Sequence, residues 1–170
     1  MRIVAGAWRG RQITAPDDDS VRPTADRVRE AWLSIIGPEI VGARVLDLFA
    51  GSGALGLESL SRGAAVAEFV DVSRRSLDAL RANIAALGAG ERAIIHRGDA
   101  IRFAAGLNPG AFDVAFADPP FKLGLAEGIA EQWLAIRFAG VLGIEHSSHE
   151  RMPAGGETRK YGTTSITFYR

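Results

Sequence analysis

The fold is decided by one short run of the chain, VLDLFAGSGALG at residues 45–56. Its first part, 45–49, is apolar apart from Asp47 and is typical of a buried strand. Its second part places Gly51, Gly53 and Gly56 in the spacing G-x-G-x-x-G, between that strand and a helix-like stretch. Glycines there let the backbone turn tightly and let a ligand approach it, and a helix N-terminus can hold an anion. The run therefore predicts a strand, a loop and a helix that bind a cofactor.

The remainder of the chain repeats this alternation. Further strands are predicted at 66–70, 93–96, 113–117 and 141–145, and helices at 54–62, 74–87, 100–106 and 123–136. Alternating strands and helices predict a parallel sheet covered on both faces. The C-terminal end differs, because 158–161 and 165–169 are typical of two strands joined by a short turn at Gly162. The sequence thus predicts an α/β fold whose doubly wound sheet is mostly parallel and has an antiparallel strand at its end.

Residues 1–40 precede this pattern and form a smaller unit. The stretches 3–5 and 12–14 flank Trp8-Arg9-Gly10, which predicts a small hairpin. Trp8 could stack on a base there, or could cover the core. A helix is expected next, with Thr24 placed to cap it and Gly37-Pro38 to end it. We therefore divide the chain into a hairpin-and-helix extension, 1–40, and a main domain, 41–170.

The composition excludes several classes of site. The 170 residues contain no cysteine, which excludes disulfides, thiolate nucleophiles and cysteine zinc sites and fits a reducing compartment. No apolar run approaches the roughly 18 residues of a membrane span, and no apolar stretch of a secretory signal follows Met1. The three histidines are scattered, so we predict no metal site. We expect a monomeric, cytoplasmic protein that does not bind membranes.

The net charge is zero, but the charges are unevenly distributed. Arg2, Arg9 and Arg11 stand among the first eleven residues without an acid, and basic residues again outnumber acids from residue 151 onward. Basic ends on a neutral body could hold a polyanion locally, or could be ordinary solvated side chains.

Acids stand at the carboxyl ends of four predicted strands. They are Asp47, Asp71, Asp99 and Asp118. Ligands of open α/β sheets bind at the edge where parallel strands end, so we expect these carboxylates on one rim. Asp71 follows Gly51 by 20 residues, the spacing of an acid that binds a ribose. The glycine loop and this acid fit any adenosine-containing cofactor, and for a single acid the alternative is turn capping.

The tetrapeptide Asp118-Pro119-Pro120-Phe121 favours methyl transfer to a planar amine. The lone pair of such a nitrogen is delocalised, and acceptors for its two N–H groups would make it more nucleophilic. Asp118 supplies a carboxylate, and proline fixes φ and removes N–H donors, which leaves backbone carbonyls bare. Phe121 offers a ring face on which an extruded base can stack. The alternative is a plain loop with a core phenylalanine.

Over nearly its whole length the chain resembles the RsmD-type guanine-N2 methyltransferases of bacterial 16S ribosomal RNA. The glycine loop and the Asp-Pro-Pro-Phe corner are common to many methylases. Three further blocks narrow the resemblance from methylases in general to this family. They are RIVAG at 2–6, RGR at 9–11 and RPTADRVRE at 22–30. It implies a class I, Rossmann-like fold with a seven-stranded sheet, and S-adenosylmethionine as the cofactor.

The resemblance also implies a role for individual residues. The cofactor contacts that it implies are Asp47, Gly51 and Gly53 for the methionine part, Asp71 for the ribose, and Asp99 with Ala100 for the adenine. The contacts to the target guanine are Asp118, Pro119 and Phe121. The RNA contacts are Arg9, Arg11, Arg22, Thr24, Arg27 and Arg29.

The implied reaction moves a methyl group onto N2 of a guanine in 16S rRNA, within the 30S subunit or an assembly intermediate. The residues themselves leave three alternatives. One is another amine methylase, acting on DNA or on a protein glutamine. The second is a NAD-dependent oxidoreductase that uses the glycine loop. The third is a non-catalytic RNA-binding module.

Overall fold

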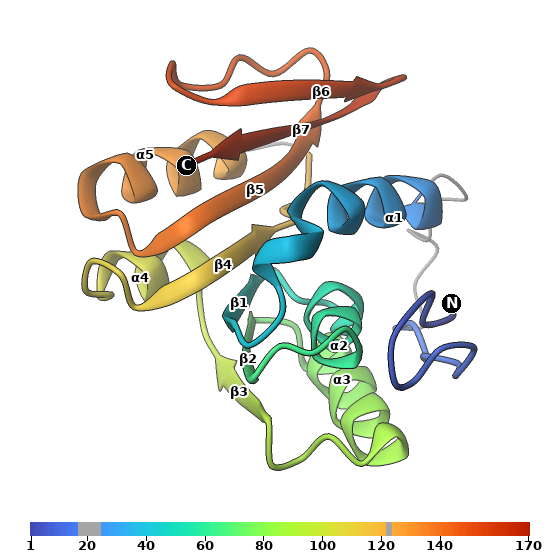
Figure 1. The fold of residues 1–170 in the computed structure, drawn as a ribbon. Coiled ribbons are helices and arrows are strands. Elements are labelled where there is room, and N and C mark those ends of the chain that lie inside the picture. The colour runs from blue at the N-terminus through green and yellow to red at the C-terminus, as the bar shows by residue number, and fades with distance from the viewer. Residues whose placement is uncertain (17–24, 122–123) are drawn as a thin grey trace.

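Seven strands form one sheet in the computed structural model, which describes residues 1–16, 25–121 and 124–170 (Figure 1). The strands are β1 (Arg44–Leu48), β2 (Val66–Asp71), β3 (Ala93–Arg97), β4 (Phe112–Ala117), β5 (Ala139–Ser147), β6 (Glu157–Tyr161) and β7 (Thr164–Tyr169). Their order across the sheet is β3-β2-β1-β4-β5-β7-β6. The pairs among β1 to β5 are parallel, and β7 runs antiparallel to both of its neighbours. The predicted mostly parallel sheet with an antiparallel end is confirmed.

Helices cover both faces of the sheet. They are α1 (Ala25–Ile36), α2 (Ala54–Ser61), α3 (Arg74–Leu87), α4 (Ala100–Ala105) and α5 (Leu125–Ile136), with a 3₁₀ turn at Gly37–Glu39. The first three pack on one face, and α4 and α5 pack on the other (Figure 1). Apolar residues supply both cores because they alternate along the strands: Val114 joins the first core and Ala115 the second. The order of strands reverses beside β1, the position at which ligands of such sheets bind.

Local capping explains where two helices begin. The Ser73 hydroxyl accepts a hydrogen bond from Ser76 N and starts α3, and Asp99 Oδ1 accepts one from Arg102 N and starts α4. Gly88 closes α3 in the left-handed conformation, at φ 66°. The bounds of α3 agree with the predicted 74–87. The predicted cap of α1, Thr24, lies outside the described residues.

The predicted N-terminal hairpin forms with less strand pairing than expected. Residues 3–5 do not pair with 12–14 as two strands; one antiparallel bridge joins Arg2 to Gln12. Ile3 N donates across the hairpin to Arg11 O, and Ile13 N to Met1 O, but the two donors that follow Ile3 bind α2 instead of the opposite strand. Val4 N and Ala5 N donate to the Glu58 carboxylate, at 2.7 and 3.3 Å.

The extension shares a core with the sheet. Ile3 and Ile13 are buried in the same cluster as Leu57 of α2 and Val45 of β1. The division at residue 40 therefore remains an interpretation of the chain, and the two parts are packed together. At the far end of the sheet, β6 forms an edge that is exposed along most of its length. Among the helices of the described residues, none is both long and apolar enough to cross a membrane.

Candidate functional site

The loop between β1 and α2 has the backbone that its glycines predict. Gly51 and Gly53 have φ of 57° and 85°, in the left-handed region that glycine favours. A Cβ on Gly53 would lie 2.3 Å from Leu80 Cδ1, so the loop packs directly on α3. At Gly51, in contrast, a Cβ would meet no atom within 4 Å. The loop is thus closed toward the core and open on the side of Gly51, where a ligand can approach its backbone.

Phe49 enters this loop in an unusual conformation. Its φ is 56°, and only one other non-glycine residue in the described chain, Arg137, has a positive φ. A bulky residue in this region is strained, and such strain is concentrated at functional sites. No feature of the sequence predicts this conformation.

Asp47 lies beneath the loop and is 1% exposed. Its Oδ2 accepts a hydrogen bond of 2.9 Å from Gly56 N. Gly56 lets α2 lie this close to the sheet, because a Cβ there would lie 2.4 Å from Phe69 Cε1. Burial raises the pKa of Asp47 well above its usual value, the Gly56 bond opposes this, and the charges of Asp118 and Asp71 raise it further.

Sheet register brings three of the four predicted acids together. Asp47 pairs with Phe69 on one side and Phe116 on the other, and Asp71 and Asp118 each lie two residues beyond those partners. Side chains two residues apart in a strand point to the same face. The three carboxylates therefore share the face covered by α1, α2 and α3, which agrees with their mutual effect on the pKa of Asp47.

Asp71 and Asp99 also accept hydrogen bonds from nearby backbone N–H groups. Asp71 Oδ2 accepts from Gly51 N at 2.9 Å and Oδ1 accepts from Ser73 N at 2.8 Å, so Asp71 links the glycine loop to the start of α3. Asp99 follows β3 and caps α4 on the opposite face, and Ala100 beside it is buried. Turn capping and a cofactor role are compatible here, because a carboxylate has about four acceptor positions.

The Asp-Pro-Pro-Phe corner directly follows β4. Asp118 N donates to Leu48 O at 3.4 Å, which extends the pairing of β4 with β1 by one residue. Asp118 and Pro120 are exposed, Pro119 is buried and Phe121 is half-buried. The corner is thus fixed to the strand that carries Asp47, and it presents a carboxylate at the surface of the rim.

The candidate RNA contacts fall into three groups. Arg9, Arg11 and Arg27 are exposed, and Arg11 Nη2 donates to Ala86 O at 2.6 Å. Arg29 is only 7% exposed, and its guanidinium donates to Arg2 O and lies 3.4 Å from Asp26. Arg29 therefore joins α1 to the N-terminal segment instead of facing solvent. Arg22 and Thr24 lie outside the described residues.

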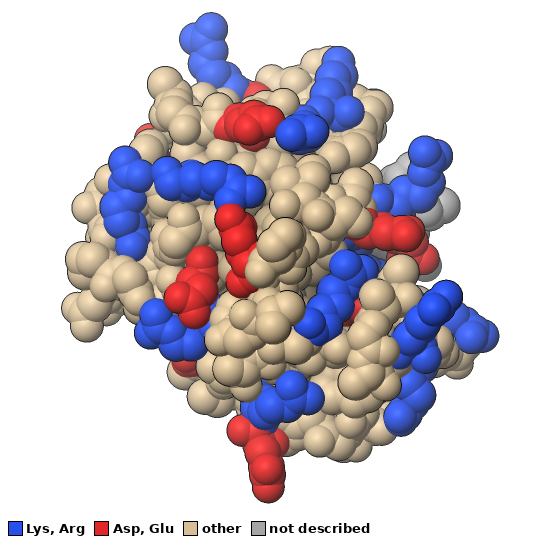
Figure 2. Space-filling view, in the orientation of Figure 1, with Lys and Arg blue, Asp and Glu red and all other residues tan. Residues whose placement is uncertain are grey.

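Trp8 covers the core instead of standing free. Its side chain packs against the core of α1, α2 and α3, and the Arg92 guanidinium lies 5.3 Å from its ring centroid. Figure 2 shows basic and acidic side chains interspersed over the visible face, without a continuous basic field. On this face, positive charge is therefore confined to separate groups of basic side chains.

Two buried polar residues, Glu58 and Asn83, were missed as candidates by the sequence analysis. Glu58 of α2 is 1% exposed and accepts the two N-terminal amides described above. Asn83 of α3 bonds to both Thr14 and Ser52. The available signal was a polar residue on an apolar helical stripe, since Leu80, Asn83 and Leu87 lie on the buried side of α3.

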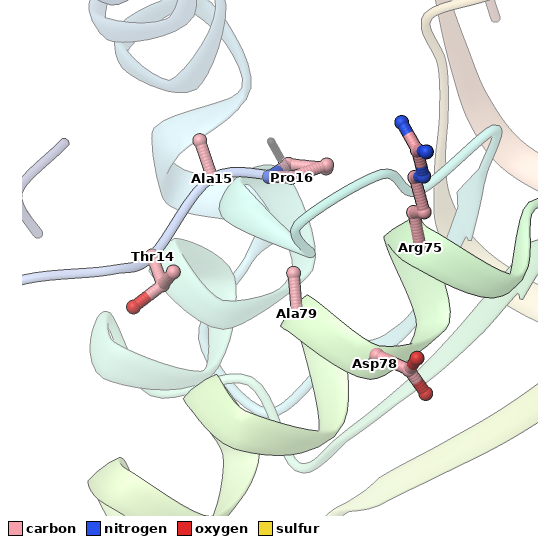
Figure 3. A pocket seen from close by; sticks show the side chains of 6 residues that line it. All are labelled: Thr14, Ala15, Pro16, Arg75, Asp78 and Ala79. Atoms are coloured by element: carbon pink, nitrogen blue, oxygen red, sulfur yellow. The ribbon is translucent and has the colours of Figure 1, made fainter. Parts of the chain in front are cut away.

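A pocket of about 440 Å³ lies between residues 14–16 and α3. Figure 3 shows Thr14, Ala15 and Pro16 facing Arg75, Asp78 and Ala79 across it. Of the predicted site residues that the structure describes, none lines it. Within the described part of the chain, no cluster of three His, Cys, Asp or Glu side chains could hold a metal ion.

Comparison with known proteins gives consistent matches. The model of a family described as "Conserved hypothetical protein 95" matches residues 1–170. Ribosomal RNA small subunit methyltransferase D of Escherichia coli K12 is 45% identical over 127 residues, which are 75% of this chain and 63% of that protein. The matched region thus spans less than two thirds of that relative.

Two further matches cover the chain more fully. Ribosomal RNA small subunit methyltransferase D of Haemophilus influenzae is 33% identical, over 100% of this chain and 92% of its own length. The solved structure of yhhF from Escherichia coli superposes with a TM-score of 0.85, at 35% identity, over 99% of this chain and 96% of that one.

Proposed function

The chain belongs to the RsmD family, whose model is described as "Conserved hypothetical protein 95", and from this premise we propose that it is an rRNA methyltransferase. The reaction that we propose is transfer of the methyl group of S-adenosylmethionine to the exocyclic N2 amine of a guanine in small-subunit rRNA. One observation carries the proposal beyond family membership. Asp47, Asp71 and Asp118 share one face of the sheet beside a glycine loop that is open at Gly51.

The residues of the rim fit S-adenosylmethionine. Asp71 keeps acceptor positions for ribose hydroxyls after its two backbone bonds. Asp47, Gly51 and Gly53 would hold the methionine part, and Asp99 with Ala100 would hold the adenine. Val72 is a further candidate that follows Asp71, because it is 60% exposed although apolar and could cover the adenine ring.

The cofactor supplies an electrophilic methyl group, and the protein supplies position and electrostatics. Asp118 would accept N–H bonds from the guanine amine, and the carbonyls of the proline corner would accept others. Guanine presents a ring N–H beside its amine, so one ionised carboxylate can accept both. Adenine presents an acceptor at that ring position, which would repel Asp118. Phe121 would stack on the base.

Three alternatives make different predictions for methylation of 30S particles, for methylation of DNA or protein, and for binding of NAD. The test is single-turnover incubation of the protein with 30S particles and labelled S-adenosylmethionine, followed by nucleoside analysis. We expect N2-methylguanosine in the rRNA. Methyladenosine, or label in DNA or a protein glutamine, would indicate another amine methylase. Binding of NAD without S-adenosylmethionine would indicate an oxidoreductase, and RNA binding without any methyl transfer would indicate a non-catalytic module.

The N-terminal segment is the RNA-binding surface that we propose, through Arg9 and Arg11 on the hairpin and Arg27 on α1. Each phosphate contact adds about one unit to the log–log salt dependence of RNA binding. Replacing both Arg9 and Arg11 with Ala should weaken binding of rRNA, lower this slope by about two units and leave S-adenosylmethionine affinity unchanged. Unchanged RNA affinity and slope would show that the hairpin arginines are not phosphate contacts.

Arg44 and Arg137 provide a control with the same loss of charge. Arg44 begins β1 and Arg137 precedes β5, so both lie where strands start. Replacing these two with Ala should leave the slope nearly unchanged.

We also propose where the protein acts and on what. The substrate is 16S rRNA within the 30S subunit or an assembly intermediate, and the protein acts as a cytoplasmic monomer.

A further inference from the structure

Both the oxygen and the nitrogen of the Asn83 side-chain amide form hydrogen bonds inside the protein. It is 3% exposed, on the face of α3 that packs against the core. Its Nδ2 donates to Thr14 O at 2.8 Å and to Ser52 O at 2.9 Å, and its Oδ1 accepts from Thr14 N at 2.8 Å. Three segments far apart in sequence therefore meet at one side chain: the N-terminal segment, the glycine loop and α3.

The bond to Ser52 acts on the part of the loop that would face the cofactor. Ser52 lies between Gly51, which is open to a ligand, and Gly53, which packs on Leu80. Leu80 and Asn83 are three residues apart on α3, and so the same helix face holds two successive residues of the loop. Asp71 holds Gly51 from the other side. Loss of the Asn83 bond would leave the Ser52 carbonyl buried without this partner and would release the middle of the loop.

The bonds to Thr14 act on the N-terminal segment. Because Thr14 donates and accepts at the same side chain, both the position and the direction of its backbone are fixed. Thr14 follows the hairpin that carries Arg9 and Arg11. The hairpin is also bound to α2 through Glu58, and α2 begins at the last residues of the glycine loop. The N-terminal segment, which lies beside α2 and α3 in Figure 1, is thus bound to the helix that follows the loop and, through Asn83, to the loop itself.

We propose that Asn83 is a positioning residue that couples the N-terminal segment to the glycine loop, so that RNA on the segment and S-adenosylmethionine on the loop strengthen each other's binding. The inference rests on the proposed function. RNA that immobilises the segment holds Thr14, and thereby the orientation in which Asn83 binds Ser52. The cofactor then meets a loop that is already ordered. Because coupling between two sites is reciprocal, the cofactor must strengthen RNA binding by the same factor.

The test is a double-mutant cycle in which one variant breaks both ends of this link and the other weakens only the end at Thr14. Asn83→Ala removes both ends, whereas Thr14→Pro removes the Thr14 N–H donor without touching the glycine loop. Affinity for S-adenosylmethionine is measured by calorimetry below the melting transition of each variant. We expect it to fall about tenfold in Asn83→Ala and about three- to fivefold in Thr14→Pro, since one buried hydrogen bond corresponds to such factors. The double variant should bind as Asn83→Ala does, because the two changes break one link.

A second measurement separates coupling from a loss of structure. In the wild type, 30S particles should raise the affinity for S-adenosylmethionine by about fivefold or more, the lower end of usual coupling factors. In Asn83→Ala this factor should disappear, which a merely destabilised protein would not show. Asn108→Ala is the matched control, because Asn108 is the other asparagine of the chain and is exposed. It should behave as the wild type does.

Different outcomes overturn the inference and the function on which it rests. Failure of the wild type to bind S-adenosylmethionine would overturn the proposed function. Normal binding by the wild type with additive losses in the cycle, an unaffected Thr14→Pro variant, or an unchanged 30S factor in Asn83→Ala would overturn the coupling alone. If Asn83→Ala does not fold, Asn83→Asp takes its place, because it retains the shape and the acceptor but loses both donated bonds.

Discussion

Aspartates at the two ends of the central strands have pKa values that are shifted in opposite directions. At the starting end, Asp113 of β4 accepts a 2.8 Å bond from Arg44 N and lies 3.4 Å from Arg44 Nε. The backbone bond is the main cause of a lowered pKa, to which the Arg44 guanidinium adds. At the finishing end of the same two strands, Asp47 is buried close to two other carboxylates and its pKa is raised.

We propose that this difference separates an acid that stabilises the fold from an acid that serves a ligand. A carboxylate beside an arginine favours the folded state, whereas a buried carboxylate near like charges opposes folding until a donor arrives. Asp47 and Asp71 accept hydrogen bonds from the backbone of the glycine loop and its neighbours. Additional donors from a cofactor or a base would offset the repulsion. We call the edge with Asp47, Asp71 and Asp118, where the strands finish, the finishing rim, and the edge with Asp113 the starting rim. Substitutions on the finishing rim should therefore change ligand binding and the rate of methyl transfer, and those on the starting rim should change only stability.

The largest effect is expected at Asp118. Asp118→Ala should lose about a hundred- to a thousandfold in the rate of methyl transfer, as expected when one preorganised partner of a reacting group is removed. Affinity for S-adenosylmethionine should remain normal, because Asp118 faces the base in our proposal. Single-turnover methylation of 30S particles measures the first quantity and calorimetry measures the second.

Two comparison variants sharpen this result. Asp118→Asn keeps the shape and one acceptor and should lose less than Asp118→Ala. Phe121→Ala should cost about 1–3 kcal/mol through poorer base stacking. A nearly normal rate of methyl transfer in Asp118→Ala would show that this acid takes no part in the reaction and that the finishing rim has a structural role.

The next effect is expected at Asp71. Its carboxylate would form charge-assisted bonds with ribose hydroxyls, and Asp71→Ala should weaken S-adenosylmethionine binding by roughly ten- to a hundredfold. Part of this loss would arise from the loop, because Asp71 also holds Gly51 N. Asp71→Asn keeps one oxygen for Gly51 N but loses the second acceptor and the charge, so it shows how much of the loss arises from the loop. A folded Asp71→Ala variant with unchanged affinity would contradict the ribose assignment.

Asp47→Asn should stabilise the protein while weakening cofactor binding. The unfolded carboxyl titrates near 3.8, and the folded one titrates higher. Between these values the folded state binds more protons, so stability falls as pH rises through the raised pKa. Asn keeps an oxygen for Gly56 N without the charge. We expect a gain of about 1 kcal/mol at neutral pH, or about 2–4 °C in melting temperature.

Thermal melts at a series of pH values test this prediction. The advantage of Asp47→Asn over the wild type should grow from about pH 4 upward, because only the wild type ionises at this position. If the stability advantage of Asp47→Asn shrinks as pH rises, the charge of Asp47 is favourable in the folded protein. Asp47 and Asp113 would then not differ in the way that we propose.

The smallest effect is expected at Asp113. Its side chain is half exposed, so solvent screens its interaction with Arg44 and Asp113→Ala should cost less than about 1 kcal/mol. Because its folded pKa is lowered, the stabilisation is present above the ordinary value of 3.8 and is lost as pH falls through the folded value. Acid unfolding of wild type and variant should therefore converge at low pH. A change in methyl transfer caused by Asp113→Ala would break the division between the two rims.

The fold was predictable because its signals are local. The apolar run at 45–49 and the glycines after it lie in continuous sequence, and the bounds of α3 follow from Ser73 and Gly88 within one stretch. The three acids of the rim were also predictable, since each stands at the end of a strand whose neighbours follow from the alternation.

The rest of the site depends on contacts across long separations. The sequence does not reveal that Asn83 forms hydrogen bonds with Thr14, which lies 69 positions away. Nor does it reveal that Glu58 accepts hydrogen bonds from the amides of the N-terminal segment. The same contacts explain why the hairpin pairs less than predicted. Arg29 illustrates the converse: the resemblance implies an RNA contact for it, but in the structure its guanidinium points inward and binds Arg2 O.

The exposed strand at the end of the sheet bears on the behaviour of the protein in concentrated solution. A free strand edge offers unpaired backbone groups on which another molecule can add a strand. On β6 these groups are flanked by Glu157 and Arg159, which form an ion pair, and by the charge of Lys160. A second chain that docked there would have to remove water from three charged groups. The same strand that completes the sheet thereby discourages its extension into a polymer.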